Sequence, residues 1–433
     1  MNSLKRIKRV ASSLFVILSF FQSASAQLTI EECVSKAEAN YPLVRKYGLL
    51  KATRDIELSE INRSWLPRLS AYGQATIQNV VPSFPSSLSG VLDQMGQTVR
   101  GLGRLQYKVG IDLSQSLWDG GASRVRRDVA RAQEATRSAA LDVELYDVRR
   151  RVGSLFFAVL LTDRQIELTE VTHRLLEINL RRLQAMIRDG VAMQSDADMV
   201  EARYLSVGQS ITEAKSASDG YRRVLELFIG ENLDGVTFVL PDAQIPATET
   251  SDRPELRLFG RRMDANRALD RLSDVSLMPR VGLFAQAYYG YPGFDYFNSM
   301  MSRDLSFNIL AGVKVAWNID AFYSRKNNRR RTSVDTRDIA ADRDLFLFNS
   351  EMQVASQSEA IAAMREVMKN DARIIELQQN VRKAAEAQLE EGVIDTTALL
   401  SKISDENIAR LNGELHIIRL QQEIYNLKYT LNR

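Results

Sequence analysis

The sequence predicts an α+β protein in which two similar halves each combine two β-strands with a hairpin of long helices. Three observations lead to this fold class. The phrase WLPRLSAYGQA at residues 65–75 returns as LMPRVGLFAQA at residues 277–287, which indicates an internal duplication. None of the nine prolines falls within residues 86–240 or 293–433. Short segments in which apolar and polar residues alternate precede each long helical stretch.

The helical stretches are rich in Ala, Leu, Glu, Arg and Gln, and they lack Pro, which costs about 3 kcal/mol inside a helix. Each is interrupted once, by Asp-Gly-Val at residues 189–191 and by Glu-Gly-Val at residues 391–393. Glycine followed by short polar residues is typical of a helix end and a new helix start. We expect helical hairpins with tips near residues 190 and 392. Their rising arms cover residues 122–189 and 324–391, each about 100 Å long; the returning arms cover 194–230 and 395–433, and shorter helices 29–64 and 253–276.

Each expected strand carries apolar side chains on one face and polar side chains on the other. In residues 107–117 the apolar side chains share one parity, and residues 312–320 repeat the pattern with Val313 and Val315 opposite Gly312 and Lys314. The duplicated phrase supplies the partner strands, which gives β-hairpins at residues 66–118 and 278–320. The third strand, residues 281–289, alternates least clearly.

Four such strands suit either a transmembrane barrel with a wet lumen or a small soluble sheet with one face on a core. Aromatic residues at the strand ends and loops favour the membrane, because they resemble an interfacial girdle. An open sheet edge in lipid leaves backbone groups unpaired, so several copies would have to pool their strands. Two copies would give a packed interior, whereas three or more would leave room for a channel.

Residues 1–26 predict an export signal. A basic segment precedes an apolar run of residues 10–21, and Ala24-Ser25-Ala26 forms a cleavage signal, so the mature chain is expected to begin at Gln27. The alternative, a membrane anchor, is disfavoured because so short a run does not span a bilayer as a helix. The signal holds four basic residues and no acidic one, so its removal lowers the net charge from +3 to −1. Such a balance gives no sign of nucleic-acid binding.

Enzymatic chemistry finds little support in the sequence. The single cysteine, Cys33, cannot form an internal disulfide, and His173 and His416 lie within helical stretches without a metal-ligand spacing. We therefore expect neither catalytic residues nor a metal or other cofactor.

The order of these features resembles the TolC-type outer-membrane efflux protein family. The resemblance covers residues 28–431 and rests on LTIEECVSKAEANYPLVRK, WLPRLSAYGQ, LSQSLWDGG before a long helix, and the two glycine tips. It implies a homotrimer with a 12-stranded β-barrel in the outer membrane of a Gram-negative bacterium, and an α-helical barrel of coiled-coil hairpins, roughly 100 Å long, in the periplasm.

The resemblance also implies a function and partners. The chain would be a passive exit duct of a tripartite efflux or type I secretion system, for small toxic molecules, drugs or secreted polypeptides. It would contact outer-membrane lipid, a periplasmic adaptor (membrane fusion protein) and an inner-membrane pump. The alternative is a soluble periplasmic coiled-coil adaptor or structural protein.

The expected domains are a signal peptide (1–26), a first repeat (27–230), a linker (231–251) and a second repeat (252–433). The family places the periplasmic aperture and adaptor contact at the tips, which matches Gly190, Val191, Asp196, Gly392, Val393 and Asp395. Ala398 and Ser401 stand where some members carry paired aspartates. For Asp196 a plain helix-capping role is an equal alternative.

Two further groups of residues are expected near the membrane. Pro67–Arg68 and Pro279–Arg280 would mark the passage from helix to barrel, with each Arg near the lipid headgroups or simply solvated. Basic clusters after the strands would meet phosphates of the inner leaflet or, alternatively, form a solvated face paired with acids of a neighbouring helix. Their members are Arg124, Arg126 and Arg127 in the first cluster, and Arg325, Lys326, Arg329, Arg330 and Arg331 in the second.

Overall fold

The computed structural model describes residues 27–96, 101–190, 193–247, 251–391, 393–394 and 396–432. The chain divides into two compact units. The first, here the helical unit, is drawn from residues 1–47, 139–258 and 342–433, and the second, the sheet unit, from residues 48–138 and 259–341. The expected signal peptide lies outside the described residues.

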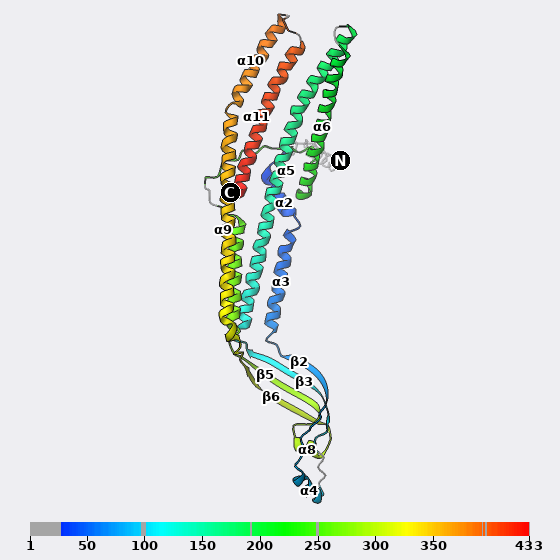
Figure 1. Ribbon diagram of the computed structural model, residues 1–433, viewed down its shortest axis with the longest axis vertical. Coiled ribbons are helices and arrows are strands. Elements are labelled where there is room, and N and C mark those ends of the chain that lie inside the picture. Colours follow the sequence, from blue (N-terminus) through cyan, green and yellow to red (C-terminus); the bar gives the residue numbers. More distant parts are fainter. Residues whose placement is uncertain are drawn as a thin grey trace, which may run out of the picture. The chain divides into compact units, whose positions relative to one another are not determined.

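The sheet unit is built on a four-stranded antiparallel sheet with the order β2-β3-β5-β6 (Figure 1). Its strands are β2 (Arg68–Ile77), β3 (Leu105–Trp118), β5 (Arg280–Tyr291) and β6 (Ser306–Ala316). Strand β3 from the earlier part of the chain pairs with β5 from the later part, so one sheet contains all four expected strands. The outer strands β2 and β6 each have one edge without a partner in the described chain.

The loops that join the strands contain helices that the sequence analysis does not anticipate. Helix α4 (Ser86–Gln94) lies between β2 and β3, and α8 (Tyr296–Met301) lies between β5 and β6. Tyr291, which is buried, holds these loops together: its hydroxyl accepts a hydrogen bond from Gly103 N at 2.7 Å and donates to Ser299 O at 3.0 Å.

The helical unit contains long helices, several of which follow one another closely in the sequence. Its own elements are α2 (Ile30–Asn40), α6 (Gln194–Ile229), α10 (Asp371–Glu390), α11 (Thr396–Leu431) and the paired short strands β1 (Gln27–Leu28) and β4 (Thr237–Phe238). Four further helices contribute residues to both units: α3 (Val44–Arg63), α5 (Ala122–Arg188), α7 (Pro254–Val275) and α9 (Ala321–Met368). None of the helices in the described ranges is long and apolar enough to cross a membrane.

Two expected helices are each divided. Helix α2 ends before Pro42, because a proline disfavours helical backbone at the preceding residue, and α3 follows. The expected rising arm at residues 324–391 is divided at Lys369 and Asn370 into α9 and α10. There the backbone N–H groups of both residues bond three residues back, at 3.3 and 3.4 Å, which tightens the end of α9. By contrast, α5 continues without a break for 67 residues.

The main core of the helical unit packs α2 against the middle of α5 and the end of α6. Phe156 and Phe157 of α5 lie fully within it, and Leu225 of α6 joins them. Cys33, on α2, is completely buried in the same core, and burial raises the pKa of its thiol to about 12. The cysteine is therefore a packing residue and not a reactive group.

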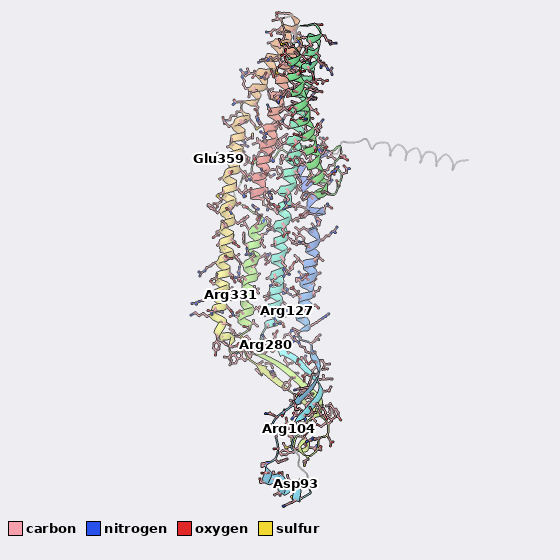
Figure 2. The ribbon with its side chains drawn as sticks, turned by 45° about the vertical axis from the view of Figure 1, so that its right-hand side comes forward. Asp93, Arg104, Arg127, Arg280, Arg331 and Glu359 are labelled. Carbon is pink, nitrogen blue, oxygen red and sulfur yellow. The ribbon has the colours of Figure 1, made fainter. Side chains whose placement is uncertain are left out.

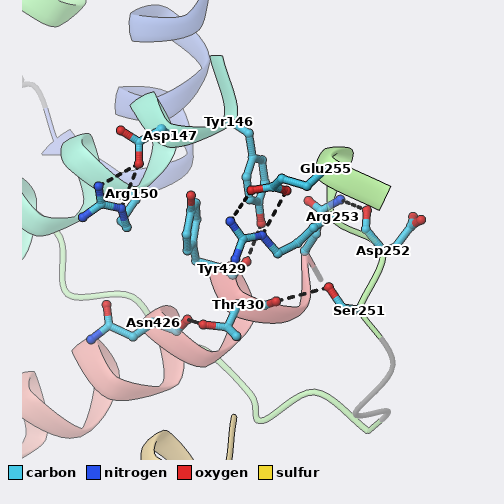
Figure 3. Close-up of polar contacts among 11 residues, drawn as sticks. Tyr146, Asp147, Arg150, Ser251, Asp252, Arg253, Glu255, Asn426, Tyr429 and Thr430 are labelled. Carbon is cyan, nitrogen blue, oxygen red and sulfur yellow. Dashed lines mark hydrogen bonds and ion pairs between the residues drawn. The ribbon is translucent and has the colours of Figure 1, made fainter. Parts of the chain in front are cut away.

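A second cluster in the helical unit joins the start of α7 to the end of α11 (Figure 3). The Arg253 guanidinium carbon lies 4.9 Å from the ring centre of Phe346, 5.4 Å from Tyr429 and 5.9 Å from Tyr146, and Glu255 pairs with the same guanidinium. The Tyr146 hydroxyl also donates to Tyr429 O at 2.5 Å. The carboxylate and the ring faces compensate the largely buried cation, so this cluster fixes the end of α11.

In the sheet unit, Asp119 shapes the turn from β3 into α5. Its carboxylate accepts hydrogen bonds from Gly121 N at 3.0 Å and from Ser123 N and Oγ at 2.6 and 2.5 Å. Burial raises the pKa of Asp119, but these bonds outweigh that effect and hold the pKa below its usual 3.8. The Asp of the WDGG phrase is thus the N-terminal cap of the longest helix.

Asp119→Ala should lower the stability of the protein by about 1 kcal/mol, because the cap is lost. The measurement is the thermal midpoint of detergent-solubilised protein, followed by the helical circular dichroism signal. A carboxylate with a depressed pKa stabilises above its unfolded pKa, so the deficit of Asp119→Ala should shrink as the pH falls below about 4.

Asp320→Ala is the matched control, because Asp320 stands just before α9 and its side chain accepts no hydrogen bond from the described residues. Equal losses in the two variants would contradict the capping role.

Candidate functional site

The sheet has one apolar and one polar face, and the apolar face is exposed in the chain. The register places Leu69, Leu113, Ala285 and Ala311 in one row across the strands, and Val109, Tyr289 and Phe307 in another. Val109 is 69% exposed and Val313 62% exposed. Exposure of so continuous an apolar surface to water is energetically unfavourable. This face therefore requires lipid or another apolar covering.

The register also explains the weak alternation of the third strand. In β5, Leu283, Ala285 and Ala287 lie on the apolar face, whereas Phe284 and Tyr288 lie on the polar face. Tyr288 is buried there against Phe294, with the ring centres 5.3 Å apart. Aromatic residues on both faces hide the period of two in the sequence, although the strand itself is regular.

A hydrogen-bonded cluster occupies the middle of the polar face. Gln286 Nε2 donates to Asp112 Oδ1 at 2.8 Å and to the Tyr72 hydroxyl at 3.0 Å. Lys108 Nζ lies 5.7 Å from the ring centre of Tyr72 and 5.3 Å from that of Tyr288. The alternation within each strand places each of these residues on the polar face. Their contacts cannot be predicted from the sequence, because the residues belong to three strands and the strand register brings them together.

The two Pro-Arg phrases lie where helices lead into strands. Pro67 directly precedes β2, and Pro279 directly precedes β5. Arg68 pairs with Ser114 and Arg280 with Ala316, which places both cations on the polar face. Figure 2 shows Arg280 at the end of the sheet beside the helices. The register thus turns these cations away from the apolar face.

A cavity of about 830 Å³ opens on this end of the polar face. Arg68, Arg126, Arg280 and Lys314 all line it, as do Asp112 and Asp119. Both carboxylates are already bonded, Asp112 to Gln286 and Asp119 to its capping donors. Within the described chain, none of the four cations has a hydrogen bond or an ion pair.

The basic clusters have mixed surroundings. Arg325 Nε lies 3.6 Å from Asp274 Oδ1, and Arg329 Nη2 lies 3.1 Å from Asp274 Oδ2. Arg127, labelled in Figure 2, donates to Asn62 Oδ1 at 3.1 Å. Arg124 and Lys326 are exposed. Pairing with acids of a neighbouring helix therefore accounts for Arg325 and Arg329, and lipid phosphate contact stays a prediction.

The expected tip residues are only partly described. Gly190 has a φ of +74°, a conformation that favours glycine, and it ends the turn after α5. Asp196 Oδ2 accepts a hydrogen bond from Met193 N at 3.3 Å, so it stabilises the start of α6 as the capping alternative expects. Val393 is exposed, and its N–H bonds to Gln388 O at 2.8 Å. Val191, Gly392 and Asp395 lie outside the described residues.

The two histidines have partners within helices. His416 Nδ1 lies 2.8 Å from Asp371 Oδ2, and His173 stacks on Tyr204 with the ring centres 4.2 Å apart. Across the described ranges, no three His, Cys, Asp or Glu residues gather as a metal site.

Comparisons with known proteins connect these features to a family. Residues 36–231 match the model of the family described as outer membrane efflux protein. No curated protein matches the chain in sequence.

Solved structures of outer-membrane channels share its fold. The Campylobacter jejuni CmeC channel has a TM-score of 0.63 and 14% identity over 93% of this chain and 84% of that one. The open Neisseria gonorrhoeae MtrE channel has a TM-score of 0.62 and 14% identity over 93% and 88%. Vibrio cholerae VceC has a TM-score of 0.61 and 12% identity over 93% and 94%.

The family model covers the first sheet hairpin and the first helical hairpin, and the channel fold extends over nearly the whole chain. Members of this family are transport proteins and not enzymes. Residues 36–231 are thus similar to the outer membrane efflux protein family, and the chain shares the fold of solved outer-membrane channels.

Proposed function

We propose that three copies of this chain form a passive exit duct of a tripartite efflux or type I secretion system. The observation that carries this proposal is the two-faced sheet with two unpaired edges. An apolar face suits contact with outer-membrane lipid, and a polar face suits a watery lumen. Backbone groups along β2 and β6 need partners in lipid, so β6 of one copy would pair with β2 of the next.

Strand number favours a trimer. Two copies would supply eight strands, whose interior is filled by side chains, whereas three copies supply 12 strands and leave an open lumen. The polar face carries Lys108, Asp112 and Gln286, which are suited to water and not to a closed apolar core. The same reasoning disfavours a soluble periplasmic adaptor, because its sheet would expose the apolar face to water.

The helical hairpins would continue the lumen through the periplasm. In this proposal two repeats, residues 27–230 and 252–433, are joined by a linker at 231–251. The tips around Gly190 and Gly392 would meet a periplasmic adaptor, which connects the duct to an inner-membrane pump. In this proposal the pump supplies the energy and the chain is a passive duct. The cargo would be small toxic molecules or secreted polypeptide.

Membrane fractionation followed by mass determination of the detergent-extracted protein tests this function. A trimer from the outer membrane is the expected result. A soluble monomer or dimer in the periplasm would overturn the duct and favour the adaptor.

Val109→Arg should sharply reduce the yield of trimer in the outer membrane, because a cation on the lipid-facing side of a barrel costs about 2–4 kcal/mol. Ser114→Arg is the matched control: it places the same charge on the same strand, but on the polar face. Native electrophoresis of detergent extracts measures both. A normal trimer yield from Val109→Arg would count against lipid contact at this face.

Gly190→Val should weaken export without loss of trimer, because a β-branched residue at a φ of +74° costs about 1–2 kcal/mol and distorts the tip. The measurement is the resistance of a deletion strain, complemented with each variant, to a panel of toxic compounds. Gly220→Val is the control, since Gly220 lies within α6 with open space around its Cβ position. Equal resistance from Gly190→Val and wild type, at equal outer-membrane levels, would contradict the tip assignment.

A further inference from the structure

The strongest unassigned feature is the group of cations at the helix-proximal end of the polar sheet face. Three of them belong to the sheet itself: Arg68 begins β2, Arg280 begins β5, and Lys314 pairs with Gly282 near the end of β6. The register carries all three to the same face. Arg126 reaches the same cavity from α5. These four residues are called the basic band below.

The charge of the basic band is not balanced within its cavity. The two acids that share the cavity are engaged by uncharged donors, Asp112 by the Gln286 amide and Asp119 by Ser123 and Gly121. Four cations therefore face two carboxylates, and neither carboxylate forms an ion pair with them. Elsewhere in the sheet unit, cations find acids: Arg329 pairs with Asp274, and Arg54 with Glu134.

Acids on a neighbouring helix offset part of the band. Glu57 and Glu60 of α3 line an adjacent groove together with Arg68 and Arg126, although no ion pair joins them in the described chain. Arg280 and Lys314 do not line that groove, so Glu57 and Glu60 do not offset their charge. The strongest positive potential should therefore lie between Arg280 and Lys314, beside the ring of Phe284.

We propose that the basic band is an anion-binding collar at the inner end of the barrel lumen, which takes the carboxylate, sulfate or phosphate groups of exported molecules. This inference rests on the proposed function, because only the closed trimer turns the polar face into a lumen. Three copies would bring twelve cations to one ring. Guanidinium groups suit this task because they donate paired hydrogen bonds to planar and tetrahedral anions. The aromatic ring of Phe284 offers an apolar surface to the remainder of an amphipathic cargo.

The collar also has a consequence for transport. A duct must hold its cargo weakly enough to release it, and exposed cations in water bind single anions weakly. The collar would therefore raise the local concentration of anionic cargo without trapping it, and its effect would decrease with ionic strength.

Titration calorimetry of the detergent-solubilised protein with sodium tripolyphosphate tests the collar. We expect saturable binding that weakens as salt is raised. The double variant Arg280→Gln/Lys314→Gln should weaken it by about tenfold or more, because charge-assisted hydrogen bonds are lost. Arg68→Gln should have a smaller effect, since Glu57 and Glu60 already offset that cation.

The matched control is Arg330→Gln/Arg331→Gln, which removes two exposed cations from α9, outside the cavity. Equal binding by wild type and the Arg280→Gln/Lys314→Gln variant, with both proteins trimeric, would overturn the collar and leave the duct intact. Failure of the wild type to form trimers would overturn the duct, and the collar with it.

A second arm separates cargo from lipid phosphate. The protein is reconstituted in vesicles of phosphatidylcholine alone or with phosphatidylglycerol, and tripolyphosphate binding is measured again. Equal affinity in the two vesicle types is expected for a lumenal collar. Weaker binding with phosphatidylglycerol would mean that lipid headgroups occupy the cations, which would overturn the lumenal location.

Discussion

The pairing of backbone hydrogen bonds in the sheet is the constraint on which the rest of the molecule depends. Four strands satisfy one another internally, but β2 and β6 each present an unpaired edge, and the apolar face on the same strands is suited to lipid, where unpaired groups are costly. In the proposed duct, the covalent chain supplies only part of a barrel. A complete barrel with a lumen would then form only between copies.

The turn from the sheet into the long helix is a second constraint on the structure. A strand ends at Trp118, and α5 begins four residues later, so the turn must redirect the chain within a very short segment. Asp119 accomplishes this with three hydrogen bonds. On the opposite passage, Pro67 and Pro279 each stand four residues after the end of a helix and directly before a strand. The same turn places Arg126 over the polar face, so the residues that shape the junction also determine its charge.

Much of the fold follows from local patterns, and what does not follow depends on distant contacts. Alternation and the absence of proline correctly predict the four strands and the uninterrupted α5. The break at Lys369 and Asn370 has neither glycine nor proline to mark it, and α4 and α8 lie in segments whose composition is that of loops. The cluster around Arg253 joins residues of four helices, and Gln286 contacts Asp112 only because of the strand register. The strand register was likewise needed to show that Arg68 and Arg280 lie on the polar face. Contacts between residues far apart in the chain produce no periodic pattern in the sequence, so they cannot be predicted from it.

The burial of Cys33 has a practical consequence for any study of the assembled protein. It is the only cysteine in the chain, it has no exposed surface, and its thiol carries a pKa of about 12. Maleimides and methanethiosulfonates react with thiolates, which this residue does not supply at neutral pH. Native protein is therefore a ready background for site-directed labelling. A single cysteine introduced on either sheet face would report, through its reactivity, whether it meets lipid or water.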